Sequence, residues 1–263
     1  MPATDPAGRG PTLLDAAIGT RLIALGLHLD ADDPALWVVD YPEMILDLHR
    51  RDVAAGAEAV LTSTFGANRA WLDRFGRASD WKAINARAAA LARQAAGPDG
   101  LVLGSTGPTA AGPDLRDQAG ALAEAGVDAL VLETHSLEQA VAALSDLRPG
   151  SDFPIVASLF RWTEGATRRL EDAGATALGV NCVVGMAEAV RIARSIRAET
   201  RLPIWLKPSA GLPGGPIESP ETFASFAPAI AGLGEVMVGG CCGTTDAHIA
   251  ALRSGLDAAR PGS

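Results

Sequence analysis

Short apolar runs alternate with helical patterns along nearly the whole chain. Alternation of this kind is typical of parallel strands joined by crossover helices. We predict eight strands, at residues 12–18, 59–65, 101–105, 129–133, 155–160, 177–182, 204–207 and 235–239. The clearest helical patterns are at residues 42–55, 86–96, 186–199 and 247–259. Eight strand–helix repeats of this length predict an α/β protein built as a single (β/α)8 TIM barrel.

One domain accounts for the whole repeat pattern. Barrels of this class commonly reach about 250 residues as one unit, and no linker or low-complexity block interrupts these 263 residues. We therefore expect one barrel domain over residues 1–263, with a flexible segment at residues 1–10. A doubly wound open sheet has the same periodicity and stays open as an alternative. Its dinucleotide-binding form is disfavoured, because no Gly-x-Gly-x-x-Gly pattern follows the first strand.

Composition narrows the class of function. Hydrophobic residues make up 48% of the sequence, the net charge is -9 and the pI is near 4.9. Nucleic-acid binding needs clustered Lys and Arg, so no nucleic-acid partner is expected. No apolar stretch reaches the roughly 20 residues that span a bilayer, and the first ten residues do not resemble a secretion signal. We expect a cytoplasmic protein with no membrane partner and with reduced thiols.

The three cysteines of the sequence all follow apolar runs. Cys241 and Cys242 lie in the glycine-rich stretch 239–244, and Cys182 follows Asn181 at the end of the sixth predicted strand. The C-terminal ends of barrel strands meet at one mouth, so the three thiols can converge there. Three protein ligands with an open fourth position are typical of a catalytic zinc site. The alternative for any one of them is a free cysteine that packs as a small buried hydrophobe.

These motifs resemble the homocysteine S-methyltransferase family, which includes betaine-homocysteine methyltransferase and the homocysteine-binding domain of cobalamin-dependent methionine synthase. The resemblance is carried by Gly239-Gly240-Cys241-Cys242-Gly243-Thr244, Asn181-Cys182, Glu133-Thr134 and Lys207-Pro208-Ser209-Ala210-Gly211. It implies a zinc-dependent thiol S-methyltransferase in which Cys182, Cys241 and Cys242 bind Zn(2+) and the zinc binds the sulfur of homocysteine. It also implies that the substrate thiolate attacks the methyl group of a donor to give methionine, with no further catalytic side chain.

Other residues at strand ends are candidates for binding the rest of homocysteine. A carboxylate at a strand end is costly unless it meets a cation, so we expect Glu133 to bind the substrate ammonium, as the resemblance also implies. The hydroxyl of Ser63 and the backbone around Ser105 are candidates for the substrate carboxylate. Asp15 matches the first-strand aspartate of the family and is expected to bind substrate or to orient its loop. We expect Asn181 to support the neighbouring cysteine or the substrate through its amide.

The core motifs do not select the methyl donor. Family members use methylcobalamin, S-methylmethionine, S-adenosylmethionine or betaine, and residues 207–213 are more similar to the methionine synthase pattern. We expect the methyl donor to be methylcobalamin carried by a separate corrinoid protein. A free sulfonium compound is a nearly equal alternative. Ala16 and Ser209 depart from the family pattern, which has glycine and asparagine there. Three other functions stay open: a non-catalytic zinc and thiol-amino-acid binding barrel, a methyltransferase for another thiol, and an unrelated barrel enzyme whose cysteines are buried bystanders.

Overall fold

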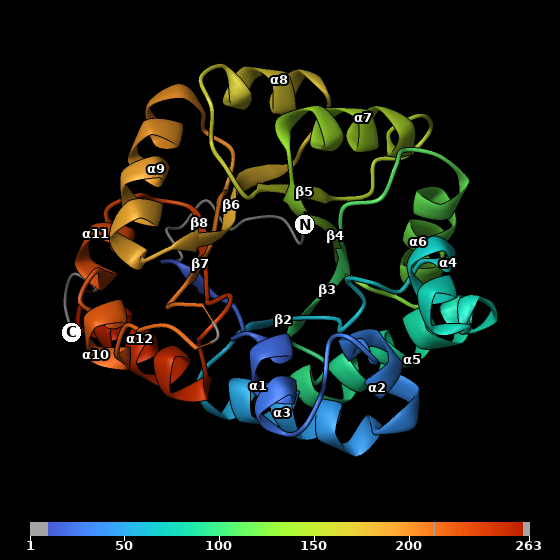
Figure 1. Cartoon of the computed structure of the whole chain (residues 1–263). Coiled ribbons are helices and arrows are strands. Elements are labelled where there is room, and N and C mark those ends of the chain that lie inside the picture. Colours follow the sequence, from blue (N-terminus) through green and yellow to red (C-terminus); the bar gives the residue numbers. More distant parts are fainter. Residues whose placement is uncertain (1–9, 213, 260–263) are drawn as a thin grey trace.

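The computed structural model describes residues 10–212 and 214–259. Residues 1–9 of the segment predicted to be flexible lie outside the described residues, and so does position 213 of the loop after the seventh strand. The described chain forms one parallel sheet of eight strands in the order β1-β8-β7-β6-β5-β4-β3-β2. At the seam, Leu14 pairs with Ala59 in a parallel bridge. The sheet therefore closes on itself, which confirms the predicted barrel (Figure 1).

The helices form a ring around the strands (Figure 1). The strands are β1 (Thr12–Leu13), β2 (Ala59–Leu61), β3 (Leu101–Thr106), β4 (Ala129–His135), β5 (Ile155–Leu159), β6 (Ala177–Val184), β7 (Ile204–Ser209) and β8 (Val236–Val238). The α-helices are α1 (Ile18–Ala24), α2 (Pro34–Asp40), α3 (Pro42–Ala54), α4 (Arg69–Leu72), α5 (Trp81–Ala96), α6 (Pro113–Glu124), α7 (Leu137–Leu147), α8 (Ala166–Asp172), α9 (Met186–Glu199), α10 (Pro220–Ala224), α11 (Ala227–Ala231) and α12 (Asp246–Ala258), and two 3-10 helices are η1 (Asp73–Phe75) and η2 (Ala78–Asp80). Among the described helices, none has the length and apolar character needed to cross a membrane.

The predicted bounds were wrong mainly at the first two strands. We expected the second strand over residues 59–65, whereas β2 ends at Leu61. We expected the first strand over residues 12–18, whereas β1 ends at Leu13 and α1 begins at Ile18. Just beyond β1, the Asp15 carboxylate accepts the Leu61 N–H at 2.8 Å, and its carbonyl accepts the Gly240 N–H at 3.1 Å. These bonds join Asp15 to β2 on one side and to the loop after β8 on the other. These two bonds do not follow the regular hydrogen-bond ladder of a parallel sheet, so β1 ends at Leu13.

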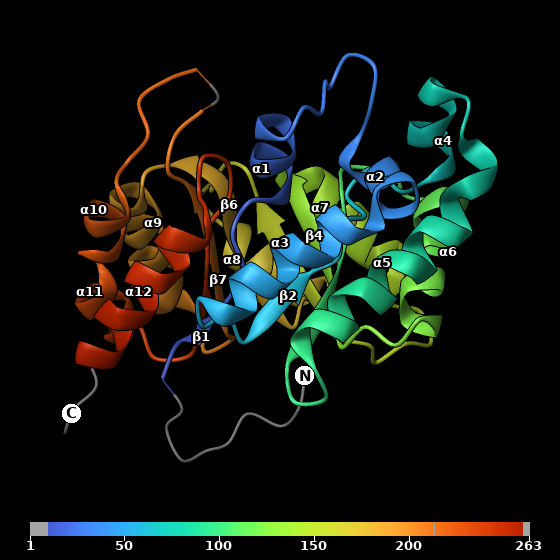
Figure 2. The same ribbon diagram turned by 90° about the horizontal axis from the view of Figure 1, so that it is seen from below.

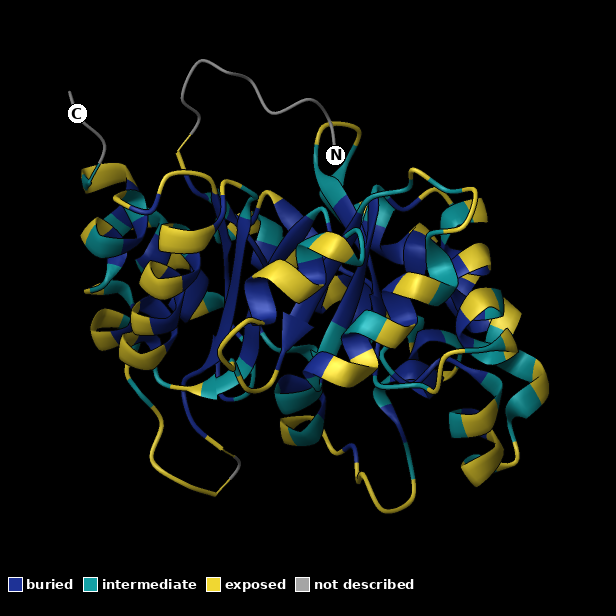
Figure 3. Cartoon of the chain, turned by 90° about the horizontal axis from the view of Figure 1, so that it is seen from above, coloured by how far each residue is buried: buried dark blue, intermediate teal, exposed yellow. Residues whose placement is uncertain are grey.

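Apolar side chains fill the barrel interior below the C-terminal ends of the strands. The interior cluster consists of Leu14, Ala59, Leu61, Leu103, Ala129, Val131, Val156, Ala177, Trp205 and Met237. Gly179 lies beside the largest of them, Trp205, and a Cβ at Gly179 would lie 1.9 Å from the Trp205 carbonyl oxygen. A separate, larger cluster packs the outer faces of the strands against the helices. In Figure 3 the strands are mostly coloured as buried, and the outer parts of the helices as exposed.

The loops that follow the C-terminal ends of the strands form the mouth of the barrel. Figure 2 shows α1, the segment between α1 and α2, and the loop between β7 and α10 rising on the same side of the sheet. In a parallel barrel this is the side where binding and catalytic residues gather. The apolar interior thus forms a floor on which a polar layer can be held.

Candidate active site at the barrel mouth

A layer of polar side chains lies directly beyond the apolar interior. Residues two positions apart on a strand point to the same face. Two residues past the last interior-cluster residue of β2, β3, β4, β5 and β7, this spacing places Ser63, Ser105, Glu133, Ser158 and Lys207. In β6 it places Asn181 two residues past Gly179. All six are buried except Glu133, which is half-buried. The layer therefore brings together four of the predicted substrate-binding residues.

The three thiols predicted as zinc ligands also lie together. The Sγ atoms of Cys182, Cys241 and Cys242 are within 4.8 Å of one another, and no described His, Asp or Glu joins the group. The Sγ–Sγ distances are 2.9 Å for Cys182–Cys241 and 4.0 Å for Cys241–Cys242. Zinc–thiolate bonds of about 2.3 Å put the sulfurs of a tetrahedral site roughly 3.8 Å apart. The triad fits a zinc ion if the closer pair opens by about 1 Å, with the fourth ligand coming from outside the chain.

The thiols already polarise one another. Hydrogen bonds from Cys182 and Cys241 lower the pKa of Cys242, whereas the hydrogen bond with Cys182 raises the pKa of Cys241. Zinc ligation requires all three as thiolates, and a bound cation is what makes that possible at neutral pH.

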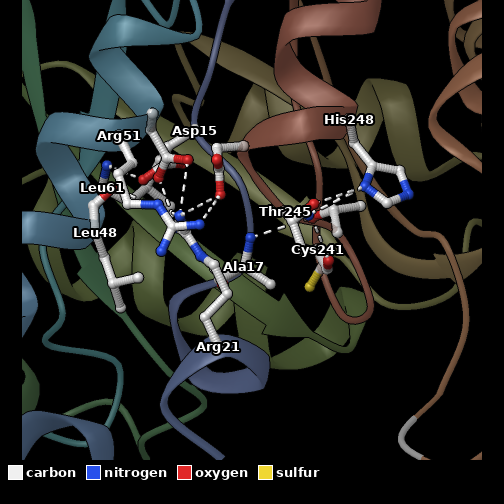
Figure 4. Close-up of polar contacts among 12 residues, drawn as sticks. Asp15, Ala17, Arg21, Leu48, Arg51, Leu61, Cys241, Thr245 and His248 are labelled. Carbon is white, nitrogen blue, oxygen red and sulfur yellow. Dashed lines mark hydrogen bonds and ion pairs between the residues drawn. The ribbon is translucent and has the colours of Figure 1, made fainter. Parts of the chain in front are cut away.

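The loop after β8, which carries Cys241 (Figure 4) and Cys242, makes a tight turn. A Cβ at Gly240 would lie 2.3 Å from Thr244 Oγ1, so only glycine fits there. The Thr244 hydroxyl donates to the Cys241 carbonyl at 2.7 Å and accepts the Ala17 N–H at 3.1 Å. The glycine-rich sequence thus lets the backbone fold tightly around Thr244, which holds the first cysteine of the pair.

His248 lies at the start of α12, just after the cysteine loop. Its Nδ1 accepts the Thr245 N–H at 3.2 Å, and its Nε2 donates to the Glu218 carbonyl at 2.9 Å. Both ring nitrogens are therefore used. The imidazole joins Thr245, at the end of the cysteine loop (Figure 4), to the loop between β7 and α10.

Irregular backbone aims the residues at the ends of β4 and β6 into the mouth. Thr134 and Cys182 have φ angles of 60° and 59°, the only positive values among the described residues other than glycine. The strand registers shift at both places, between Leu132 and His135 in β4 and between Asn181 and Val184 in β6. Bulges of this kind re-aim side chains next to active sites. They also carry β4 and β6 two residues past their predicted ends.

Asn181 links the two irregular positions. Its Oδ1 accepts the Thr134 N–H at 2.9 Å and the Ser158 hydroxyl at 2.7 Å. Its Nδ2 donates to Thr134 Oγ1 at 2.7 Å and lies 3.6 Å from Cys182 Sγ. The amide is fully used by protein groups. Its observed contacts are those of a residue that positions the cysteine, one of the two roles expected for it.

Asp15 is also held by protein groups. Its Oδ2 accepts the Leu61 N–H at 2.8 Å, and its Oδ1 lies 2.5 Å from Lys207 Nζ. Both side chains are almost fully buried. Figure 4 shows the Asp15–Leu61 contact beside the Arg21 guanidinium, which is paired with the buried Asp52. Of the two roles expected for Asp15, these contacts support the orienting one.

Glu133 carries an unused acceptor. Its Oε1 is buried and has no hydrogen-bond partner among the described residues. Burial raises the pKa of Glu133 to about 7, and the positive charge of Lys207 opposes the rise. A buried carboxyl with a free oxygen is stabilised when a cation binds to it. The geometry therefore suits an ammonium group.

The serines predicted near the substrate carboxylate lie in the polar layer but already have contacts. Ser63 Oγ donates to the Pro34 carbonyl at 3.3 Å, and the Ser105 N–H donates to Thr62 Oγ1 at 3.0 Å. The side chain of Ser105 also lies against Glu133, where it lowers the pKa of that carboxyl. Neither serine has an evident free donor. Their role in binding stays a prediction.

Sequence reasoning missed two residues of the site. Lys207 was noted only as part of a motif, although the two-residue spacing from Trp205 would have placed it in the polar layer. Ser209 was noted only as a departure from the family pattern. Its hydroxyl is buried beside Cys242 and lowers the pKa of that thiol, without reaching hydrogen-bond geometry to any described partner.

The chain is similar to proteins of one family along nearly its whole length. A family described as homocysteine S-methyltransferase matches residues 12–256. The methionine synthase of Mycobacterium tuberculosis is 33% identical over 285 residues, which cover 89% of this chain and 24% of that protein. The chain thus spans about a quarter of the length of the mycobacterial methionine synthases that it matches.

Two comparisons cover a whole relative. The homocysteine S-methyltransferase of Escherichia coli K12 is 28% identical over 297 residues, covering 92% of this chain and 94% of that protein. The crystal structure of the homocysteine methyltransferase MmuM from Escherichia coli in its metallated form superposes with a TM-score of 0.78 at 27% identity, covering 94% of this chain and 96% of that one.

Proposed function

The chain belongs to the homocysteine S-methyltransferase family, and from that premise we propose that it transfers a methyl group from a donor to the sulfur of homocysteine, producing methionine. The observation that carries the proposal is the convergence of three thiols within 4.8 Å at a barrel mouth that also holds the unpaired carboxyl oxygen of Glu133. Thiolates suit zinc, and the carboxylate suits an amino-acid ammonium.

We assign the metal ligands to Cys182, Cys241 and Cys242. When bound, zinc would keep the substrate sulfur in the thiolate form, which is the nucleophile toward an electrophilic methyl group. The part played by the chain itself is to hold the three sulfurs at one point. Asn181 does this for Cys182, and Thr244 does it for Cys241.

The polar layer binds the amino-acid end of homocysteine in this proposal. Glu133 accepts the substrate ammonium through its free Oε1. Ser63 and Ser105 lie in the same layer and contact the substrate beside it. Asp15 and Asn181 act mainly by holding other groups in place, because their own polar atoms already have partners.

For the donor, we favour a methylated corrinoid carried by a separate protein over a free sulfonium compound. Every exposed large hydrophobic side chain of the described residues lies at the end of a strand or in the segment between that strand and the main helix that follows it. This mouth rim consists of Leu25, Leu29, Tyr41, Phe160, Val184, Leu212 and Ile217. We infer that exposed apolar side chains on this one face of the barrel contribute to an interaction surface. A donor presented by a protein needs such a surface, whereas a small sulfonium needs only a pocket beside the metal.

The proposal also places the protein in a reducing compartment. All three cysteines are free thiols, and two of the sulfurs are only 2.9 Å apart. Oxidation would remove metal ligands. The cytoplasm keeps thiols reduced and is the location that we propose.

The experiment that tests the function is methionine formation from homocysteine by protein purified under reducing conditions with zinc supplied. We expect about one zinc per chain and methyl transfer with at least one of methylcobalamin, S-methylmethionine, S-adenosylmethionine and betaine. Cys241→Ala should lose zinc and activity while the barrel stays folded, since Cys241 lies in a loop at the mouth. Zinc-loaded protein that forms no methionine with any of the four donors would contradict the proposal.

A further inference from the structure

Lys207 is a buried lysine in a chain whose basic residues are nearly all arginines. The sequence holds 22 basic residues, of which two are lysines, Lys82 and Lys207. The Lys82 side chain is 66% exposed, whereas that of Lys207 is 6% exposed. Burying an ammonium costs free energy that pairing offsets only when its hydrogen bonds are also satisfied. The position of Lys207 in the polar layer therefore needs an explanation.

The ammonium of Lys207 has one donor to spare. It can donate three hydrogen bonds, and two go to Asp15, at 2.5 Å to Oδ1 and 3.2 Å to the backbone carbonyl. No third acceptor for Nζ is found among the described residues. Since Asp15 is itself anchored to Leu61 of β2, the ammonium is held in a fixed place at the mouth.

The spare donor of Lys207 and the free acceptor of Glu133 belong to the same layer. Each residue lies two positions past an interior side chain of its strand, Trp205 in β7 and Val131 in β4. Their charges act on each other, because Lys207 lowers the pKa of Glu133 and Glu133 raises the pKa of Lys207. No hydrogen bond joins the two side chains in the described structure, so one positive and one negative partner remain available. An α-amino acid carries the complementary pair of groups on one carbon.

We propose that Lys207 binds the α-carboxylate of homocysteine while Glu133 binds its ammonium. The inference rests on the proposed function and extends it, because it makes the site selective for a zwitterionic thiol over a simple thiol amine. Asp15 is then a positioning residue, which holds Nζ in place for the substrate. The predicted substrate role of Asp15 is exerted through Lys207.

The test compares two ligands that differ only in the carboxylate, homocysteine and 3-aminopropane-1-thiol. Both are titrated by calorimetry into zinc-loaded wild-type protein, Lys207→Met and the control Lys82→Met. A lost charge-assisted hydrogen bond lowers affinity roughly tenfold to a hundredfold. We expect Lys207→Met to lose this much for homocysteine and to bind 3-aminopropane-1-thiol as the wild type does. Lys82→Met should match the wild type for both.

Two results would overturn the assignment. Equal loss of both ligands in Lys207→Met would make Lys207 a structural partner of Asp15, and unchanged affinity for both would remove it from the site. A wild-type protein that binds neither ligand would instead contradict the proposed function. The outcomes are therefore distinguishable.

Two further measurements keep the inference testable if Lys207→Met fails to fold, because that change leaves the Asp15 carboxylate buried without its cation. Asp15→Asn/Lys207→Met removes both charges and should show the same ligand dependence. In wild-type protein labelled with 15N-lysine, the ζ resonance of Lys207 should shift on adding homocysteine and stay in place with 3-aminopropane-1-thiol. Equal shifts with both ligands would contradict carboxylate binding.

Discussion

Thr134 and Cys182 meet across the barrel mouth in the same unusual backbone conformation. Their φ angles are 60° and 59°, and Thr134 Oγ1 lies 3.8 Å from Cys182 Sγ. A left-handed conformation costs on the order of 1–3 kcal/mol for a residue other than glycine. The surrounding structure must therefore hold both residues, and the amide of Asn181 contacts both. Strain at this point positions one metal ligand.

The first prediction concerns Asn181. Asn181→Ala removes the bonds to Thr134 and Cys182, so we expect zinc affinity to fall about tenfold to a hundredfold with the barrel still folded. Competition with a chelator measures the affinity, and circular dichroism checks the fold. Ser158→Ala is the matched control, because it removes one bond to Asn181 and leaves the amide in place. Zinc affinity equal to that of the wild type in Asn181→Ala would show that the cysteine is held by other groups.

The second prediction concerns Glu133. Glu133→Gln keeps the shape of the side chain and removes its charge, so homocysteine affinity should fall about tenfold to a hundredfold while zinc affinity changes little. Calorimetry with zinc-loaded protein measures both. Glu138→Gln, an exposed change on α7, is the control. Equal losses of zinc and homocysteine would move Glu133 from substrate binding to support of the metal site.

The same carboxyl gives a pH dependence. Its pKa is raised to about 7 by burial, so a growing fraction is protonated, and unable to pair with an ammonium, as the pH falls below 7. Homocysteine affinity should therefore fall with acid more steeply in the wild type than in Glu133→Gln. Effects of pH on the thiol ligands are common to both proteins, so the difference between the two profiles isolates Glu133. If homocysteine affinity fell equally with acid in both proteins, Glu133 would not be the group that binds the substrate ammonium.

The sequence predicted the barrel and its metal ligands because both depend on repeated local signals. Eight apolar runs of similar spacing predict the barrel, and Cys182 and the Cys241-Cys242 pair follow two of those runs. The convergence of the thiols then follows from the geometry of parallel strands. Strand alternation places Glu133 in the mouth by the same rule.

What the sequence could not predict depends on contacts between distant segments. β1 is short because Asp15 bonds to Leu61 and Gly240, which are far from it along the chain. The left-handed backbone at Thr134 and Cys182 has no local signature, since neither residue type favours it. The spare donor of Lys207 could not be counted either, because two of its three hydrogen bonds go to Asp15, 192 residues away.

The third prediction concerns a buried histidine behind the mouth. His49 of α3 is fully buried, and neither ring nitrogen has a partner among the described residues. Burial lowers its pKa to about 4; the charge of Asp15 opposes this, while Arg21 and Lys207 add to it. The unfolded chain, with a histidine pKa near 6.5, then binds the proton more tightly than the folded protein. Stability contributed by neutral His49 is present above pH 6.5 and is lost as the pH falls toward 4, by about 3 kcal/mol in all.

His49→Leu should remove the loss of folding stability that protonation of His49 causes at acid pH. We expect stability at pH 7 equal to or above that of the wild type, because two unpaired nitrogens leave the core. The free energy of unfolding should then fall less between pH 6.5 and pH 4. Denaturant titrations of zinc-loaded protein at several pH values measure it, with the exposed His28→Leu as control. Acid sensitivity unchanged from the wild type in His49→Leu would show that other groups, such as Asp52 with its raised pKa, govern this range.

The last prediction concerns the donor and rests on the mouth rim. If a corrinoid protein presents the methyl group, charges placed on the rim should weaken its docking and leave homocysteine binding intact. Val184 and Leu212 are the most useful positions, because they are 60% and 57% exposed; Val184 is the last residue of β6, and Leu212 lies in the loop after β7. We expect Val184→Asp/Leu212→Asp to lower methyl transfer from protein-bound methylcobalamin at least tenfold, because each buried apolar side chain contributes about 1.5–3 kcal/mol to docking. Calorimetry should show normal homocysteine affinity in this variant.

The wild type is assayed in parallel with methylcobalamin, S-methylmethionine, S-adenosylmethionine and betaine. Three results together would contradict the corrinoid donor: efficient turnover with a free sulfonium compound, no turnover with free or protein-bound methylcobalamin, and no effect of the rim changes. They would show that the donor is small and that the exposed apolar side chains have another role.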